Sequence, residues 1–206
     1  MDILQKLKNN QRRIGLTGGI ASGKTTITNY IRKHKNIPIL DADHFSRELI
    51  KPNTYGYKKI LDYFGNKIID NKKNSEKAIN RKLLRKIIFK DSGSKEWIEK
   101  LLHPLIKEKM IEECSQYKNN QTIVLVIPLL FEAKFEDICT EIWLVKCPEE
   151  IQKKRLITRD KISEQEAYES INLQLSFEEK RKFSDIILDN SDDQNNEWIN
   201  TIKELL

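Results

Sequence analysis

The stretch GLTGGIASGKTT at residues 15–26 constrains the fold of this chain more than any other feature. It contains G-x-x-x-x-G-K-T from Gly18 to Thr25, the P-loop pattern whose backbone N–H groups surround a phosphate. A short apolar segment at 12–17 precedes it, and from Lys24 onward apolar residues recur at helical spacing. A strand, a glycine-rich loop and a helix in this order are the context in which the pattern predicts phosphate binding.

Each residue type in the stretch has a role in holding a phosphate. Glycines are needed where the chain turns sharply or where a Cβ would block the anion. The helix directs its N-terminal N–H groups and its positive dipole end at the same anion. We expect Lys24 to reach the β- and γ-phosphates of a nucleotide and the Thr25 hydroxyl to bind Mg²⁺. The expected nucleotide-binding residues are Gly18, Gly19, Ile20, Ala21, Ser22, Gly23, Lys24, Thr25 and Thr26.

The other apolar segments predict an α/β fold. IPIL at 37–40 reads as a second strand after the helix, so the first two strands are expected to lie parallel in one sheet. Near-continuous apolar runs predict further strands at 122–127, 141–147 and 185–190. Residues 43 to about 118 read as helices, with breaks at 51–56, 70–77 and 91–94.

The C-terminal part of the chain contains several residues and motifs that are typical of helix starts. Pro148 is placed as the first residue of a helix that runs to about Asp160. Two more helices are expected to begin at S-x-x-E capping boxes, which are Ser163 with Glu166 and Ser176 with Glu179. An amphipathic helix at 196–206 closes the chain.

A P-loop alone does not separate a GTPase, an ATPase motor and a small-molecule kinase. Guanine-specific GTPases carry N-K-x-D after a later strand, whereas NKIID at 66–70 has one residue too many and follows no strand. DYFG at 62–65 matches D-x-x-G but ends a helical stretch, and motors need a longer chain. A kinase that phosphorylates a small hydroxyl compound is therefore the leading class.

Such a kinase needs a carboxylate near the acceptor hydroxyl. DAD at 41–43 closes the second predicted strand, and ligands of an open α/β sheet bind beyond the carboxyl ends of its strands. Asp43 is the expected general base, and Asp41 is expected to support Mg²⁺ or the loop. The alternative for Asp43 is a cap on the next helix, and the two roles are compatible.

Positive charge over the transferring phosphoryl group is the second requirement. Arg155 and Arg159 lie four residues apart, on one face of the helix expected after Pro148. The planar fork of arginine can bind two phosphate oxygens, and this segment is where a mobile lid could lie. The alternative is a solvated basic face paired with Glu149, Glu150 or Asp160.

The composition of the chain limits the kinds of partner it is expected to bind. The 206 residues carry a net charge of +6, which fits a solvated lysine-rich surface or a field that attracts an anionic substrate. The lysines are scattered, so nucleic acid is not an expected partner. The longest apolar run, at 122–131, is too short to span a bilayer, and the N-terminus lacks an apolar signal segment. We expect a cytoplasmic protein whose three cysteines serve packing.

Beyond the P-loop, several motifs resemble those of the dephospho-coenzyme A kinase family, over nearly the whole chain. They are IGLTGGIASGKTT, DADHFSREL at 41–49, FG at 64–65, NRKLLRKIIF at 80–89, HPLI at 103–106, PLLFE at 128–132, Gln152 with Arg155 and Arg159, and SDIILDN at 184–190. The P-loop is shared by many kinases. The order and the gaps of the DAD-x3-R-E, HPLI and PLLFE motifs are together highly specific.

The resemblance implies that ATP, with Mg²⁺, phosphorylates the ribose 3′-hydroxyl of dephospho-coenzyme A, the last step of coenzyme A synthesis. It implies a P-loop three-layer sandwich with a five-stranded parallel sheet. The implied core is about 12–42, 120–148 and 183–206, with a helical substrate subdomain at about 43–119 and a lid at about 149–180. Asp43 falls at the family's catalytic aspartate and Arg47 where substrate contacts are expected. His103 falls in HPLI, with substrate contact or buried packing as its role.

The chain departs from the family pattern at two places. Ala21 replaces the third glycine of G-G-I-G-S-G-K; we expect it to be tolerated if its φ is negative, with activity retained. Many members carry an acidic residue just before PLLFE, where this chain has Val126 and Ile127. That difference shifts the expected Mg²⁺-supporting role to Asp41 and Asp43. The extra residues 1–12 are expected to form a disordered or helical appendage.

Two other readings of the function stay open at this point. One is another P-loop small-molecule kinase, such as a nucleoside or nucleotide kinase. The other is a regulatory nucleotide-binding module without kinase activity, against which the DAD carboxylates and the arginine pair argue. For either kinase, the expected partners are ATP and a small-molecule substrate, with a monomer or weak homo-oligomer and no membrane.

Overall fold

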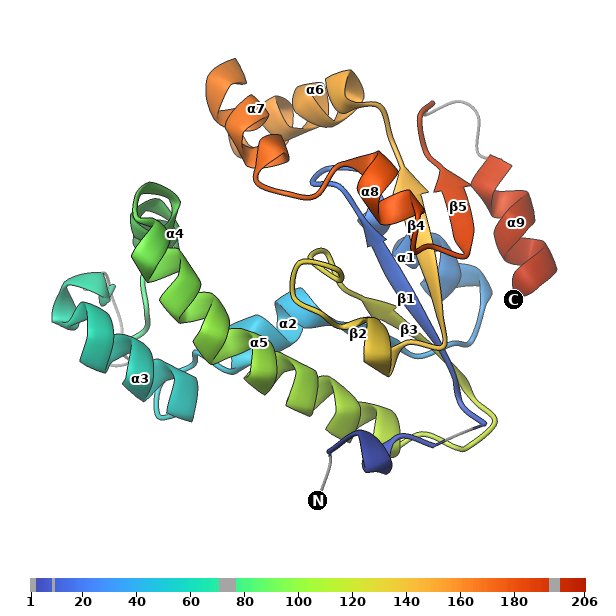
Figure 1. Ribbon diagram of the computed structural model, residues 1–206, viewed down its shortest axis with the longest axis horizontal. Helices are drawn as coiled ribbons and strands as arrows, with labels where there is room; N and C mark the ends of the chain where they lie inside the picture. Colours follow the sequence, from blue (N-terminus) through green and yellow to red (C-terminus); the bar gives the residue numbers. More distant parts are fainter. Residues whose placement is uncertain (1–2, 9, 71–76, 193–196) are drawn as a thin grey trace. The chain divides into compact units, whose positions relative to one another are not determined.

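Five parallel strands form one sheet in the order β2-β3-β1-β4-β5 (Figure 1). The computed structural model describes residues 3–8, 10–70, 77–192 and 197–206. The strands are β1 Arg12–Gly18, β2 Ile39–Asp41, β3 Thr122–Val126, β4 Glu141–Lys146 and β5 Ile186–Asp189. The expected α/β fold with a five-stranded parallel sheet is confirmed. The first two strands are parallel in one sheet, as expected, but β3 lies between β1 and β2 and pairs with both.

The chain divides into two compact units. The first, Met1–Asp41 with Glu113–Leu206, contains the sheet. The second, Ala42–Glu112, is helical.

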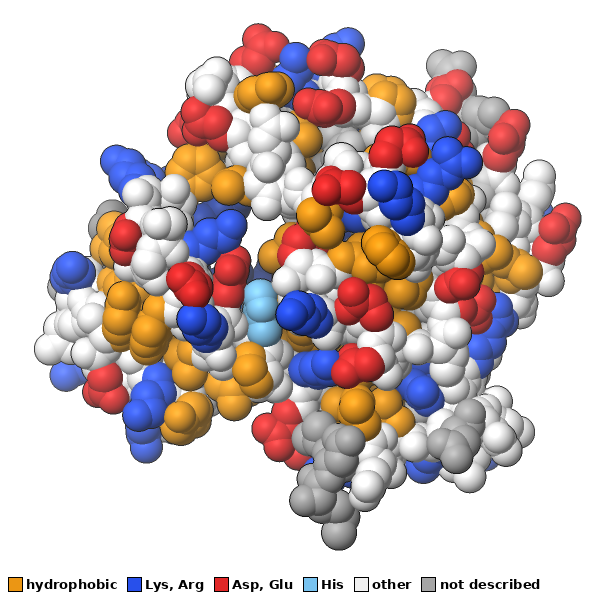
Figure 2. Space-filling model, in the orientation of Figure 1, with side chains coloured by type: hydrophobic (Ala, Val, Ile, Leu, Met, Phe, Trp, Pro, Cys, Tyr) orange, Lys and Arg blue, Asp and Glu red, His pale blue; other side chains and the backbone are white. Residues whose placement is uncertain are grey.

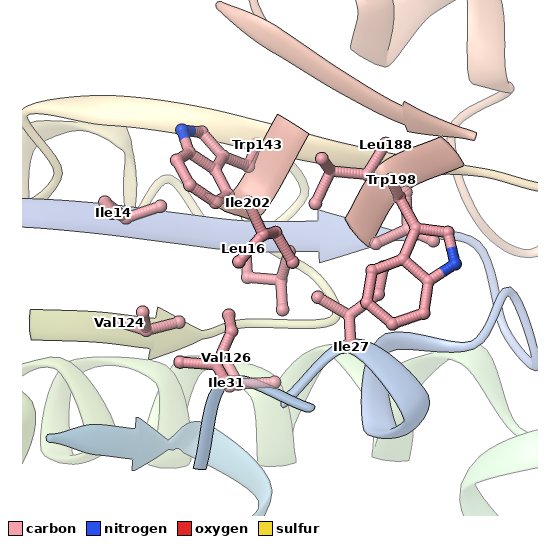
Figure 3. Packing of buried hydrophobic residues seen from close by; sticks show 11 residues of the cluster. Ile14, Leu16, Ile27, Ile31, Val124, Val126, Trp143, Leu188, Trp198 and Ile202 are labelled. Atoms are coloured by element: carbon pink, nitrogen blue, oxygen red, sulfur yellow. The ribbon is translucent and has the colours of Figure 1, made fainter. Parts of the chain in front are cut away.

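The core of the first unit lies between the sheet and two helices, α1 Lys24–His34 and α9 Glu197–Leu205. Because strand side chains alternate, Ile14 and Leu16 of β1 point to this face and are fully buried. Ile27 and Ile31 of α1 meet them because residues four apart share a helix face. Figure 3 shows this packing around the indole rings of Trp143 and Trp198. Burying each such side chain stabilises the fold by about 1.5–3 kcal/mol.

The opposite face of β1 is tightly covered, which explains Gly15. A Cβ on Gly15 would lie 2.6 Å from Cys139 Sγ and 2.8 Å from Leu130 Cδ1. Burial raises the pKa of Cys139 to about 12 and that of Cys114 to about 11. Both thiols therefore stay protonated at neutral pH and act as apolar packing groups.

Three helices connect β4 to β5. They are α6 Glu149–Asp160, α7 Glu164–Asn172 and α8 Phe177–Arg181. Both expected capping boxes form, at the starts of α7 and α8. Pro148 is the N-cap of α6 rather than its first residue, with a ψ of 142° that is extended, not helical. Lys153 joins α6 to α7: hydrogen bonds to Glu164 and Glu150 raise its pKa to about 12.

Four helices account for most of the second unit, with η2 Asn66–Ile68 between two of them. They are α2 Ala42–Glu48, α3 Tyr55–Phe64, α4 Arg81–Lys90 and α5 Ser92–Ser115, which continues past this unit. Their apolar faces meet in a cluster that includes Tyr57, Ile60, Ile68, Leu84 and Ile98. The apolar faces of these helices are thus buried against one another.

The break expected at 91–94 is present but shorter than expected. Asp91 alone separates α4 from α5, which begins at Ser92. The Asp91 carboxylate accepts a hydrogen bond from the Ser94 N–H at 2.9 Å, so a residue that reads as a loop signal acts as a helix start. Most of the expected loop at 70–77 lies outside the described residues. So does the first residue of the expected closing helix at 196–206, of which α9 is the described part.

The surface mixes charges of both signs. On the face drawn in Figure 2, Lys and Arg side chains are interspersed with Asp and Glu, with apolar side chains between them. Within the described ranges, no helix is long and apolar enough to cross a membrane. At the N-terminal end, η1 Ile3–Lys6 is a short 3₁₀ helix, which agrees with a helical appendage for that part of residues 1–12.

Candidate active site

The P-loop joins β1 to α1 through glycines in conformations that other residues rarely adopt. Gly18 ends β1 with φ 152° and Gly23 is the left-handed N-cap of α1 with φ 101°. The first helical bond runs from the Ile27 N–H to the Gly23 oxygen at 3.2 Å. The N–H groups of the first turn, from Lys24 to Thr26, therefore point out of the helix start, where the dipole favours an anion.

The cationic and hydroxyl groups expected at the P-loop lie at this helix start. Lys24 Nζ donates to the carbonyl oxygens of Gly18 at 2.8 Å and Gly19 at 2.9 Å, so its ammonium lies over the loop. Thr25 and Thr26 are exposed in the first turn of α1. Elsewhere in the described residues, no three His, Cys, Asp or Glu side chains come together as a metal site.

Carboxamide side chains from the segments after β4 and β5 contact the loop. Asn190 Nδ2 donates to the Ser22 oxygen at 2.8 Å. A Cβ on Gly23 would lie 1.9 Å from that Nδ2, and one on Gly19 would lie 2.2 Å from Gln152 Oε1. These glycines are therefore required by close packing as well as by the phosphate.

A third carboxamide, Gln174, accepts a hydrogen bond from the Ile20 N–H at 2.7 Å. Sequence reasoning missed this contact because no spacing pattern links two residues so far apart in the chain. Asn190 lies in the SDIILDN motif, but the motif does not indicate that its side chain binds the P-loop.

Ala21 adopts a left-handed backbone conformation. Its φ is 57°, in the left-handed region, so the condition under which its methyl group was expected to be tolerated without strain is not met. For an L-residue this conformation costs roughly 1–2 kcal/mol, because the Cβ approaches the following carbonyl oxygen. The replacement of glycine at this position therefore places strain inside the phosphate-binding loop.

We expect Ala21→Gly to stabilise the protein by about 1 kcal/mol, because the left-handed strain exceeds the entropy that glycine costs. In a chain of this size the melting temperature should rise by about 2–4 °C, measured by calorimetry. Ala133 is the matched control, since it does not belong to the positive-φ residues of the described chain. Ala133→Gly should lower the melting temperature, and a similar drop in Ala21→Gly would exclude the strain.

Arg155 and Arg159 on α6 have different environments. Arg155 faces the loop: its Nη1 lies 3.5 Å from the Ser22 oxygen and its Nη2 lies 3.5 Å from the Asn190 oxygen. Arg159 binds its neighbour Asp160 through two parallel hydrogen bonds of 2.8 and 3.0 Å. The structure therefore brings Arg155 to the P-loop, while Arg159 makes the pair with Asp160 that the sequence offered as an alternative.

Asp41 is at the sheet edge that carries the P-loop. It is the last residue of β2 and pairs with Val126 of β3, which also pairs with Leu16 of β1. Asp43 follows two residues later, exposed in the first turn of α2. Because α2 begins at Ala42, Asp43 lies inside the helix and does not have the N-cap position that the alternative required.

Asp43, Arg47 and His103 belong to the helical unit. Arg47 is exposed on α2. His103 is half-buried on α5, and burial lowers its pKa, although Glu99 opposes the shift. Burial therefore disfavours the protonated form of the imidazole.

Comparisons with known proteins point to one family. The family model described as dephospho-CoA kinase matches residues 12–196. A dephospho-CoA kinase of Prochlorococcus marinus (strain MIT 9312) is 89% identical over 206 residues, covering all of both chains. The solved dephospho-CoA kinase from Campylobacter jejuni is 28% identical, with a TM-score of 0.66, over 95% of this chain and 97% of that one. A solved Thermus thermophilus protein is 26% identical, with a TM-score of 0.78, over 96% and 100%.

Proposed function

The chain belongs to the dephospho-CoA kinase family, and from this premise we propose how its residues transfer a phosphoryl group from ATP to the ribose 3′-hydroxyl of dephospho-CoA. ATP-dependent phosphorylation of dephospho-CoA, in coenzyme A synthesis, is its activity. The observation that carries the proposal is the P-loop, where left-handed glycines and the N-terminus of α1 form an anion site beside Lys24.

We assign the ATP phosphates to the P-loop residues Gly18 to Thr26, mainly through the N–H groups of the first turn of α1, while the Ile20 N–H is bound by Gln174. Lys24 places its positive charge on the β- and γ-phosphates, where charge develops during transfer. The exposed Thr25 hydroxyl at the helix start would hold Mg²⁺, and Asp41 at the end of β2 would support it. When bound, Mg²⁺ neutralises phosphate oxygens.

The acceptor side of the reaction is assigned to the helical unit. Asp43 takes the proton from the 3′-hydroxyl. As it does so, the hydroxyl oxygen forms a bond to the γ-phosphorus of ATP, and the bond between the γ-phosphorus and the oxygen that bridges to the β-phosphate breaks. Arg47 binds the phosphate or ribose of dephospho-CoA, and His103 contacts the substrate. Arg155 stabilises the transferring phosphoryl group and Arg159 binds ATP.

The same proposal assigns roles to two larger regions of the chain. The region 43–119 serves as the substrate subdomain of a single P-loop kinase domain, and the region 149–180 serves as a lid, in which 150–165 is the part that moves. The lid proposal is supported by Lys153, which joins α6 to α7 so that they can move together. Crystals with and without an ATP analogue should show 150–165 closing over the phosphates, and an immobile segment would refute the lid.

A coupled ADP-release assay tests the function. Dephospho-CoA should support rapid ADP release, whereas adenosine, other nucleosides and nucleoside monophosphates should support little. A nucleoside that turns over faster would favour the rival small-molecule kinase. Binding of ATP without turnover of any acceptor would favour the regulatory module.

A further inference from the structure

Gln174 lies between α7 and α8, yet its side chain reaches the P-loop. Gln174 Oε1 accepts the Ile20 N–H at 2.7 Å, one residue before the strained Ala21. We propose that Gln174 is a positioning residue that holds the Ile20 amide, and through it the turn at Ala21, in the conformation that receives the phosphates of ATP. This inference rests on the proposed function and assigns a residue that acts through the loop rather than on the substrate.

The backbone around Gln174 is fixed on both sides. The Gln174 N–H donates to the Ile171 oxygen at 3.1 Å, as α7 ends. The Leu175 N–H donates to Glu132 Oε1 at 3.0 Å. Because the backbone is already ordered, the bond to Ile20 costs only the rotamer freedom of the Gln174 side chain and no further backbone entropy.

Glu132 is in turn anchored by a buried cation. Lys180 Nζ lies 2.9 Å from the same Glu132 oxygen, and the Lys180 side chain is 1% exposed. A buried pair of this kind is strongly unfavourable to separate, because either charge would be left uncompensated. The ion pair of Glu132 with Lys180 and the hydrogen bond of Glu132 with the Leu175 N–H therefore fix the position from which Gln174 reaches the P-loop.

The hydrogen bond from Ile20 to Gln174 matters for ATP binding because the next residue, Ala21, is strained. A non-glycine residue at φ 57° persists only where its surroundings favour that conformation over relaxed alternatives. Without the acceptor on Gln174, the Gly19–Ile20 peptide and the turn at Ala21 after it are free to populate other conformations, and ATP must select the competent one at a cost in affinity. The helical unit that carries Asp43 is not involved, so binding of dephospho-CoA should not change.

Hydrogen exchange at the Ile20 amide tests the contact without any turnover. In the nucleotide-free protein, Gln174→Met, which keeps the length but lacks an acceptor, should speed exchange of Ile20 about threefold to tenfold, the factor for one hydrogen bond. Gln174→Glu retains the acceptor oxygen and should restore slow exchange. Among the described residues, the side chain of Gln165 on α7 bonds within its helix, to Glu169, and Gln165→Met is the matched control. Unchanged exchange in Gln174→Met, or fast exchange in Gln174→Glu, would overturn the proposal.

Steady-state kinetics tests the positioning role. Gln174→Met should raise KM for ATP about threefold to tenfold and leave KM for dephospho-CoA unchanged. An unchanged KM for ATP would overturn the proposal, and tighter ATP binding would do so by showing that Gln174 competes with the nucleotide. If Gln174→Met fails to fold, the exchange and KM measurements are made on Gln174→Ala, which also lacks the acceptor. Altered exchange in a protein that turns over no dephospho-CoA would contradict the proposed function but not the contact.

Discussion

Lys24→Ala is expected to lower kcat by at least about 10³-fold, the effect of removing a cation from the transferring phosphoryl group. The substitution removes the ammonium group that lies over the loop, 2.8 Å from the Gly18 oxygen. Neither Thr25 nor the helix dipole supplies a full positive charge in its place. Initial rates of ADP release at saturating ATP and dephospho-CoA measure the loss.

Lys33→Ala is the control for this substitution. Lys33 is exposed in the last turn of the same helix, far along α1 from the P-loop, and its variant should keep nearly full activity. Melting temperatures of both variants separate a catalytic loss from an unfolded loop. Substantial activity in a folded Lys24→Ala protein would contradict the assignment of the P-loop as the site of phosphoryl transfer.

Asp43→Asn is expected to lower kcat by about 10²-fold or more, because the amide of asparagine does not accept a proton from the acceptor hydroxyl. The affinity for ATP should remain nearly unchanged, because the P-loop groups that bind its phosphates are intact. Single-turnover rates and ATP titrations measure the two quantities. Asp62→Asn, an exposed carboxylate on α3 in the same unit, is the control and should leave both unchanged. A near-wild-type kcat in Asp43→Asn would remove Asp43 from the role of base.

Much of the fold could be predicted because its elements carry local signals. The apolar runs at Thr122–Val126 and Glu141–Lys146 are strands buried on both faces, and the capping boxes mark the starts of α7 and α8. The position of β2 beside β3 rather than β1 was not predictable, since a three-residue strand carries no information about its neighbour. The break at 91–94 was predicted too long, because capping and loop residues are the same types.

The candidate site divides in the same way. The P-loop and the DAD motif are contiguous, so their residues are visible in the sequence. The φ of Ala21 and the bond from Ile20 to Gln174 depend on chain segments that only the folded structure brings together. The helix periodicity placed Arg155 and Arg159 on one face, but the pair of Arg159 with Asp160 is set by side-chain conformation, which periodicity does not determine.

The position of the new phosphate on the product is the most direct test of the account. After complete turnover of ATP and dephospho-CoA, phosphorus NMR of the purified product should show a new phosphomonoester coupled to the ribose H3′ proton. That result is expected if the acceptor hydroxyl is the 3′-hydroxyl of dephospho-CoA. A phosphomonoester coupled to H2′, or a new phosphoanhydride resonance, would contradict the proposed transfer.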